Sequence, residues 1–132
     1  MKRIILLGFI VSLSMTRLAA QPDSLRIETG QAAGDSVEYE LIVLDPGFES
    51  FLQMQPSMDY YSQQYYEHWN YRYVTEWNNR HNQPLQYGDL YETYIDYRDG
   101  INYGLELNYR LFYYFRFFEK EHGVKLLPEK AF

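Results

Sequence analysis

Apolar residues near the C-terminal end of the chain recur at the spacing of an α-helix. Over residues 103–122 they occupy about half of a helical wheel, and charged residues occupy the rest. The apolar side holds Leu107, Leu111, Phe112, Tyr114, Phe115 and Phe118, and the charged side holds Glu106, Arg110, Arg116 and Lys120. Gly123 can adopt the left-handed conformation that ends many helices. The pattern therefore predicts an amphipathic helix over residues 103–122.

Tyr113 and Phe117 depart from this pattern because they fall among the charged residues. They are i, i+4 neighbours, so their rings lie side by side on the predicted helix. Two rings in that position either pack against another element or form an exposed apolar patch. We therefore keep both as candidate binding residues.

A second stretch, residues 57–83, contains no glycine or proline and has the same helical period. Its large aromatic residues fall on one face: Tyr66, Trp69, Tyr73 and Trp77. We predict a helix over residues 59–81. Asn70 lies on its apolar face, and Asn108 lies on that of the other long helix. Because a buried amide without partners is costly, we expect each to bond to the other, to backbone or to a tyrosine hydroxyl, and so to fix how the helices cross.

Residues 37–44 begin with alternating polar and apolar side chains and continue as an apolar run, which predicts a β-strand. A lone strand would leave its backbone groups unpaired. We expect its partner to be a second strand over residues 124–128.

Two shorter helices are predicted between these elements. Asp45 is a suitable N-cap for a short helix through residues 48–52. Another is expected over residues 89–94, where Asp89 and Glu92 have the spacing of a capping box. The predicted fold class is therefore α+β and mostly helical, with two long amphipathic helices, short helices and a small two-stranded element.

The first 20 residues have the layout of a secretory signal peptide. Lys2 and Arg3 precede an apolar run over residues 4–15, and the segment closes on small residues. The run is shorter than the roughly 20 apolar residues of a membrane-spanning helix. We expect cleavage after Ala20 and a location in the periplasm or outside the cell, without direct membrane insertion.

Beyond residues 1–20, we predict three parts of the chain. Residues 21–36 are polar and poor in large apolar side chains, which favours a flexible tether. Residues 37–128 form a single globular, aromatic-rich domain. Residues 129–132 form a C-terminal tail.

Composition excludes several kinds of chemistry. The chain has no cysteine, which excludes disulfides, thiolate nucleophiles and cysteine zinc sites. Removal of the leader takes three of the 12 bases and leaves nine against 18 acids. An acidic chain repels phosphate backbones, so nucleic acid is not an expected partner. The three histidines lack metal-binding spacing, and no phosphate-binding glycine motif occurs, so no metal or cofactor is expected.

Catalysis remains as an alternative through the acids Glu76, Glu92 and Asp96. Two carboxylates that flank an aromatic cleft suit the hydrolysis of glycosides. The alternative function is thus a small glycan or cell-wall hydrolase that uses paired carboxylates. We favour a non-catalytic role, because capping and solvated charge account for these acids more simply.

Aromatic residues make up 19% of the sequence, so some of them can be displayed on the surface. Trp and Tyr combine a large contact area with a polar tip, which suits binding surfaces. The candidate binding residues are Trp69, Tyr87, Tyr91, Tyr113 and Phe117. The favoured hypothesis is a binding or protein-interaction module for an envelope protein or a glycan. A third hypothesis is a structural subunit whose edge strand, residues 37–44, pairs with another chain.

Four aromatic-rich blocks occur in order across residues 38–127: YELIVLDPGFESFL, YSQQYYEHWNYRYVTEWN, YGDLYETYIDY and YGLELNYRLFYYF. Together they resemble a family of small exported proteins of unknown function found in Bacteroidota. The resemblance implies an envelope location in a cell with two membranes, hence the periplasm or export. It brings no assigned activity and no catalytic residues. Members of that family often look like lipoproteins, and the lack of a lipobox cysteine here departs from them.

Overall fold

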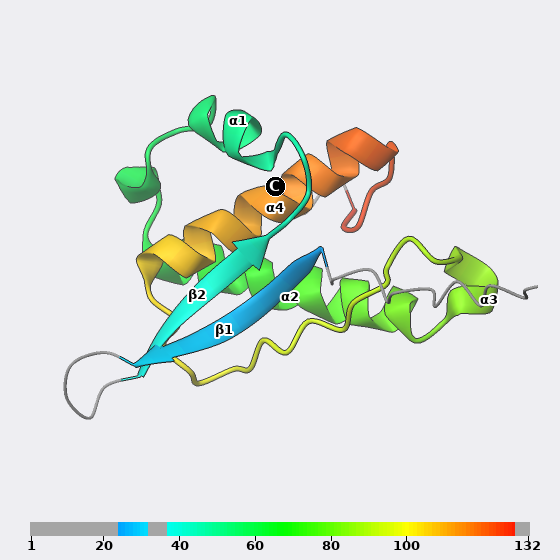
Figure 1. Ribbon diagram of the computed structural model, residues 1–132, viewed down its shortest axis with the longest axis horizontal. Helices are drawn as coiled ribbons and strands as arrows, with labels where there is room; N and C mark the ends of the chain where they lie inside the picture. Colours follow the sequence, from blue (N-terminus) through cyan, green and yellow to red (C-terminus); the bar gives the residue numbers. More distant parts are fainter. Residues whose placement is uncertain (1–23, 32–36, 129–132) are drawn as a thin grey trace, which may run out of the picture.

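The computed structural model describes residues 24–31 and 37–128, and Figure 1 shows their arrangement. In chain order the elements are β1 (Leu25–Gln31), β2 (Val37–Val43), α1 (Phe48–Gln53), a 3-10 helix (Met58–Tyr60), α2 (Gln63–His81), α3 (Pro84–Tyr87) and α4 (Leu105–His122). The fold is α+β and mostly helical, as predicted: α2 packs on α4, and a two-stranded antiparallel sheet lies across them. The predicted signal peptide and C-terminal tail lie outside the described residues.

The two long helices begin and end for local reasons. α2 begins after Ser62, whose Oγ accepts a hydrogen bond from the N–H of Tyr65 at 3.1 Å. α4 follows Gly104 and ends at Gly123, which takes the predicted left-handed conformation at φ 62°. Both helices start a few residues later than the periodicity predicts and end where it predicts.

Aromatic rings build the interface between α2 and α4. The rings of Trp77 and Phe118 meet edge to face with centroids 4.6 Å apart, and Tyr73 stacks on Phe115 at 4.9 Å. None of these four side chains is more than 2% exposed. The predicted packing of the two aromatic faces is confirmed.

One polar contact lies inside this aromatic interface. Asn70 and Asn108 are both fully buried, and Asn70 Nδ2 donates to the carbonyl oxygen of Asn108 at 2.8 Å. The Tyr97 hydroxyl donates to Asn108 Oδ1 at 2.7 Å, and Asn108 Nδ2 donates to the Gly104 carbonyl at 2.8 Å. The prediction that these amides bond to each other, to backbone and to a tyrosine is confirmed. Since such bonds require defined geometry, they fix the position of α2 along α4.

The tether predicted for residues 21–36 is corrected in its central part, because residues 25–31 form β1. Leu25 and Ile27 alternate with charged residues, and this period-two pattern gives the strand one apolar face. Leu25 is completely buried, and Ile27 packs against the core. Their burial offsets the entropy lost when this otherwise polar segment becomes ordered.

The partner of β2 is β1 and not the predicted strand over residues 124–128. The two strands run antiparallel, with Ile27 opposite Leu41. Residues 124–128 form no strand, although Leu126 and Leu127 are buried. The N–H of Leu126 instead donates to a carboxylate oxygen of Glu119 on α4 at 2.9 Å. The apolar residues of this segment therefore reach the core without a ladder of backbone bonds.

The first short helix forms near its predicted place but begins at a different residue. α1 follows Gly47 instead of Asp45, and no side chain caps it. The Asp45 carboxylate instead accepts a hydrogen bond from the Tyr114 hydroxyl at 3.0 Å. Asp45 thus ties the start of α1 to α4.

The second short helix is α3, and the helix predicted over residues 89–94 is wrong. Residue 89 therefore caps nothing, and the predicted capping box does not form. The side chain of Asn78 on α2 binds both the N–H and the C=O of Ile95, each at 2.9 Å. Trp77 Nε1 donates to the carbonyl of Thr93 at 2.7 Å. These bonds hold the connector extended along α2, in place of the helix.

Replacement of Asn108 by alanine is expected to lower the free energy of unfolding by about 1–3 kcal/mol. The substitution removes the acceptor of the Tyr97 hydroxyl and one acceptor of Asn70, both inside the core. Urea denaturation followed by tryptophan fluorescence measures the change. Asn79→Ala, at an exposed position of α2, is the control and should change the value by less than about 0.5 kcal/mol. Equal effects of the two substitutions would contradict the assignment.

Stability is expected to fall as the pH rises from 10 to 12. Burial raises the pKa of Tyr113 to about 12, and it raises the pKa of Tyr73 and Tyr114 above the ordinary 10.0 as well. The unfolded chain therefore loses phenolic protons at a pH where the folded chain keeps them, which favours unfolding. Urea midpoints between pH 8 and 12, paired with tyrosinate absorbance, test this. A midpoint that stays constant across that range would rule it out.

Candidate functional site

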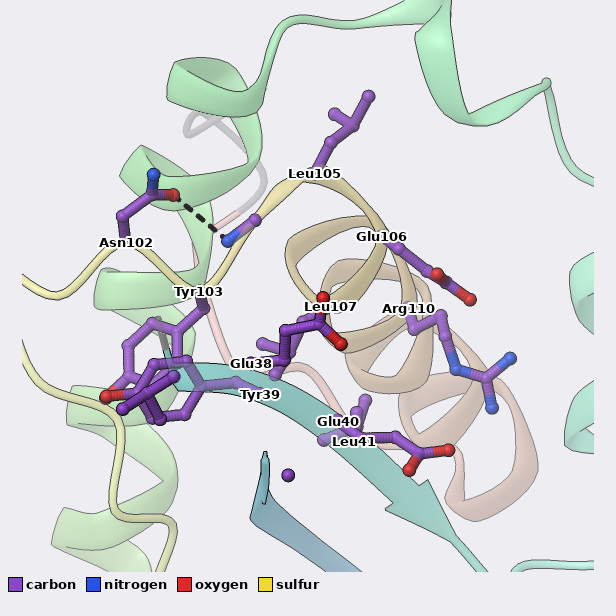
Figure 2. A pocket seen from close by; sticks show the side chains of 13 residues that line it. Glu38, Tyr39, Glu40, Leu41, Asn102, Tyr103, Leu105, Glu106, Leu107 and Arg110 are labelled. Atoms are coloured by element: carbon purple, nitrogen blue, oxygen red, sulfur yellow. Dashed lines mark hydrogen bonds between the residues drawn. The ribbon is translucent and has the colours of Figure 1, made fainter. Parts of the chain in front are cut away.

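A groove with a volume of about 660 Å³ lies between the outer edge of β2 and the start of α4 (Figure 2). Its lining consists of Gly30, residues 37–41, residues 102–107 and Arg110. Figure 2 shows side chains of the strand on one wall and of the helix on the other. This groove, called the β2 groove below, is thus lined by segments that are far apart in the sequence.

The backbone of β2 presents free hydrogen-bonding groups to this groove. The N–H of Leu44 donates to the carbonyl of Ser24 at 2.8 Å, so these directly opposed residues form a hydrogen-bonded pair. Pairs of this kind alternate along an antiparallel ladder. Val37, Tyr39 and Leu41 therefore direct their N–H and C=O groups away from β1. Within residues 24–31 and 37–128, no hydrogen bond satisfies these groups.

The floor of the groove is apolar and held in place. Tyr39 meets Tyr103 edge to face at 4.8 Å, and Leu41 and Leu107 are 2% and 3% exposed. The Tyr103 hydroxyl accepts a hydrogen bond from the N–H of Arg98 at 2.8 Å. Burial raises the pKa of Tyr103 above its ordinary value of 10.0. Tyr39 is only half-buried, so its ring is the part of this floor that an apolar side chain can contact.

The rim of the groove is acidic. Glu38, Glu40 and Glu106 are exposed, and Arg110 is the base among the lining residues. Both terminal nitrogens of Arg110, Nη1 and Nη2, donate to the carboxylate of Glu49 on α1. This hydrogen bond lowers the pKa of Glu49, and Glu49 in turn raises the pKa of Arg110. Attraction to Glu106 and Glu40 also raises the pKa of Arg110, so one base faces three acids among the lining residues and the groove keeps a net negative charge.

A sequence family described as "Family of unknown function (DUF6146)" matches residues 2–129. The chain belongs to this family. No curated protein and no solved structure matches the chain. Family membership confirms that the resemblance to a domain of unknown function is real, and it assigns no activity to the groove.

Three of the candidate binding residues lie in the core, so for Tyr113 and Phe117 the structure shows packing against other elements and no exposed patch. Tyr91, Tyr113 and Phe117 are 4%, 4% and 5% exposed. Phe117 packs on Phe48 of α1 with centroids 5.7 Å apart. Tyr113 packs against rings of α2 and of its own helix. Phe117 is buried on the charged side of α4 because α1 covers that part of the helix.

The other two predicted binding residues, Trp69 and Tyr87, are half-buried. The Arg72 guanidinium lies 5.1 Å from the Trp69 ring, and the Arg80 guanidinium lies 5.1 Å from the Tyr87 ring. Neither aromatic residue lines the β2 groove. A cation therefore already covers part of each ring.

The structure does not bring the three predicted acids together. Glu76 is bonded to Arg80 at 2.8 Å, and Asp96 is bonded to Arg98 at 2.9 Å. Glu92 lines a groove of about 360 Å³ beside the second half of α4, whereas Asp96 lines another of about 400 Å³ beside β1. Paired carboxylates at a single cleft are thus not formed from these residues.

Across the described ranges, no group of three or more His, Asp or Glu side chains has an arrangement that could hold a metal ion. None of the helices within those ranges has the length and apolarity to cross a bilayer.

Sequence reasoning missed most of the groove. The alternation of Glu38 and Glu40 with apolar residues marked one face of an edge strand. The opposite wall, residues 102–107, carried no recognisable motif. Its place beside β2 follows from the crossing of α4 under the sheet, which depends on contacts distant in sequence.

Replacement of Arg110 by glutamine is expected to return the pKa of Glu49 toward its ordinary value of 4.5. Stability should change by less than about 1 kcal/mol, because the Glu49 side chain is 64% exposed and solvent screens the pair. A carboxyl carbon-13 NMR titration measures the pKa. Lys120→Gln neutralises another cation near α1 and serves as the control. An unchanged Glu49 titration in the Arg110 variant would show that the pairing is absent in solution.

Proposed function

We propose that this protein is a non-catalytic interaction module of the cell envelope, which binds an extended segment of a partner protein along the free edge of β2. The observation that carries the proposal is the row of outward-facing N–H and C=O groups on Val37, Tyr39 and Leu41 beside a groove. An added strand satisfies such groups, and neighbouring pockets for its side chains give specificity.

Burial of the predicted binding rings supports a protein partner over a glycan. A glycan platform needs ring faces open to solvent, and Tyr91, Tyr113 and Phe117 have almost no exposed surface. The β2 edge instead offers backbone groups, which recognise another polypeptide. The strand-pairing hypothesis thus has more support than the one based on exposed rings.

The proposed location is the periplasm or the outside of the cell. The layout of residues 1–20, with basic residues before a short apolar run, supports export. Residue 20 is the proposed cleavage position. In this proposal the mature protein reaches a membrane only through its partner.

The alternative, a small glycan or cell-wall hydrolase, has less support. Two carboxylates must converge on one cleft for either mode of glycoside hydrolysis. Glu76 and Asp96 are each paired with an arginine, and Glu92 lines a different groove from Asp96. These three acids therefore do not supply the pair of carboxylates that the reaction needs.

Strand addition is tested by proline substitutions on the two edges of the hairpin. Val37→Pro removes an N–H that faces the β2 groove, and Thr29→Pro removes one that faces outward from β1. Neither N–H takes part in the ladder, so both variants should fold. Amide NMR titrations of the full chain use three hexapeptides in which valine alternates with lysine, glutamate or threonine.

We expect at least one hexapeptide to shift the amide signals of Tyr39 and Leu41, with binding weakened by about tenfold in Val37→Pro and unchanged in Thr29→Pro. Circular dichroism confirms that each variant is folded. The proposal fails if none of the three peptides binds, or if the two proline variants behave alike.

A further inference from the structure

We infer that the β2 groove selects an extended segment in which basic residues alternate with apolar ones. This inference rests on the proposed function and specifies the partner of the same site. It follows from the faces of the hairpin, from the charges on those faces and from the side chains at the floor of the groove.

The first step is the alternation of side chains along β2. Tyr39 and Leu41 point toward the helices, and Glu38 and Glu40 point to the outer face, because successive residues of a strand face opposite ways. A strand added beside β2 continues both faces. Its residues opposite Tyr39 and Leu41 face the helices, and those between them stand beside the two glutamates.

The second step is the charge on the outer face. Glu40 lies directly opposite Glu28 of β1, and two like charges in that position repel each other. Arg26, the base on this face of β1, already pairs with Glu28 at 2.7 Å. Among the described residues neither Glu38 nor Glu40 forms an ion pair. An added strand with lysine or arginine on this face would relieve the repulsion.

The third step is the far wall of the groove. Glu106 stands in the first turn of α4, where the positive end of the helix dipole favours a carboxylate. Arg110 is hydrogen-bonded to Glu49 and is also attracted by Glu106 and Glu40, so its single charge is shared among three acids. Glu106 thus adds to the negative potential around the groove, which favours a cationic segment over an acidic one even though the basic side chains lie on the outer face.

The fourth step is the apolar floor. Leu41, Leu107 and the paired rings of Tyr39 and Tyr103 form the surface beneath the added strand. Apolar side chains that alternate with the basic ones would lie against this floor. Charged side chains there would lose solvent without a partner.

The test measures binding of the lysine–valine, glutamate–valine and threonine–valine hexapeptides to the full chain by fluorescence anisotropy. We expect the lysine peptide to bind at least about tenfold more tightly than the glutamate peptide, with affinity falling as salt increases. In Glu38→Lys/Glu40→Lys this preference should reverse. Asp89→Lys/Glu121→Lys makes the same change of net charge on exposed residues away from the groove, and it should keep the wild-type preference.

N-methylation of the lysine peptide separates strand pairing from general attraction between opposite charges. Methyl groups on one set of alternate amides should abolish binding, and those on the other set should leave it intact. Loss of binding on methylation of the valine amides indicates antiparallel addition of the peptide to β2. Loss of binding on methylation of the lysine amides indicates parallel addition. Equal effects of both sets would overturn the inference.

The remaining outcomes distinguish the inference from the proposed function. If the glutamate or threonine peptide binds as tightly as the lysine peptide and shows the methylation pattern, the preference for basic residues is wrong and strand addition stands. If no peptide binds, both are wrong, and the two glutamates serve to keep the edge from pairing.

Discussion

The hydrogen bonds among Asn70, Asn108 and Tyr97 set the geometry on which the rest of the fold depends. Aromatic and aliphatic contacts between α2 and α4 are large but non-directional, so they tolerate sliding of one helix along the other. The buried amides do not tolerate such sliding, because each of them meets its hydrogen-bonding partner at only one relative position of the two helices. Tyr97 extends this constraint to the connector, which brings Tyr103 to its place under the sheet.

The hairpin depends on that helical platform. A two-stranded sheet is marginal on its own in water, and here its inner face is completed by Leu25 and Leu41 against the helices. Because α4 crosses beneath β2, one edge of the strand lies beside a groove and is not covered by a helix. The same packing that stabilises the hairpin therefore leaves its backbone groups available. The aromatic content of the chain serves this support more than it serves direct recognition.

The sequence predicted those features that depend on neighbours along the chain. Helical periodicity identified α2 and α4, and Gly123 marked the end of α4, because both signals are local. The partner of β2 was missed since β1 carries only two large apolar residues among polar ones, whereas residues 124–128 carry more. The sequence left open whether Phe117 is packed or exposed, because the answer depends on where α1 returns to α4, a contact between distant segments.

The free edge of β2 raises the question of how it avoids pairing with copies of itself. An exposed strand edge is a template for any other edge, and charged side chains are a common protection. A second β2 would bring Glu38 and Glu40 beside the same acidic face, so self-pairing meets repulsion at each outward position. A segment of opposite charge meets attraction at those positions. In the proposed function, the charge that opposes self-association would therefore also discriminate among partners, so that one pair of glutamates would serve both effects.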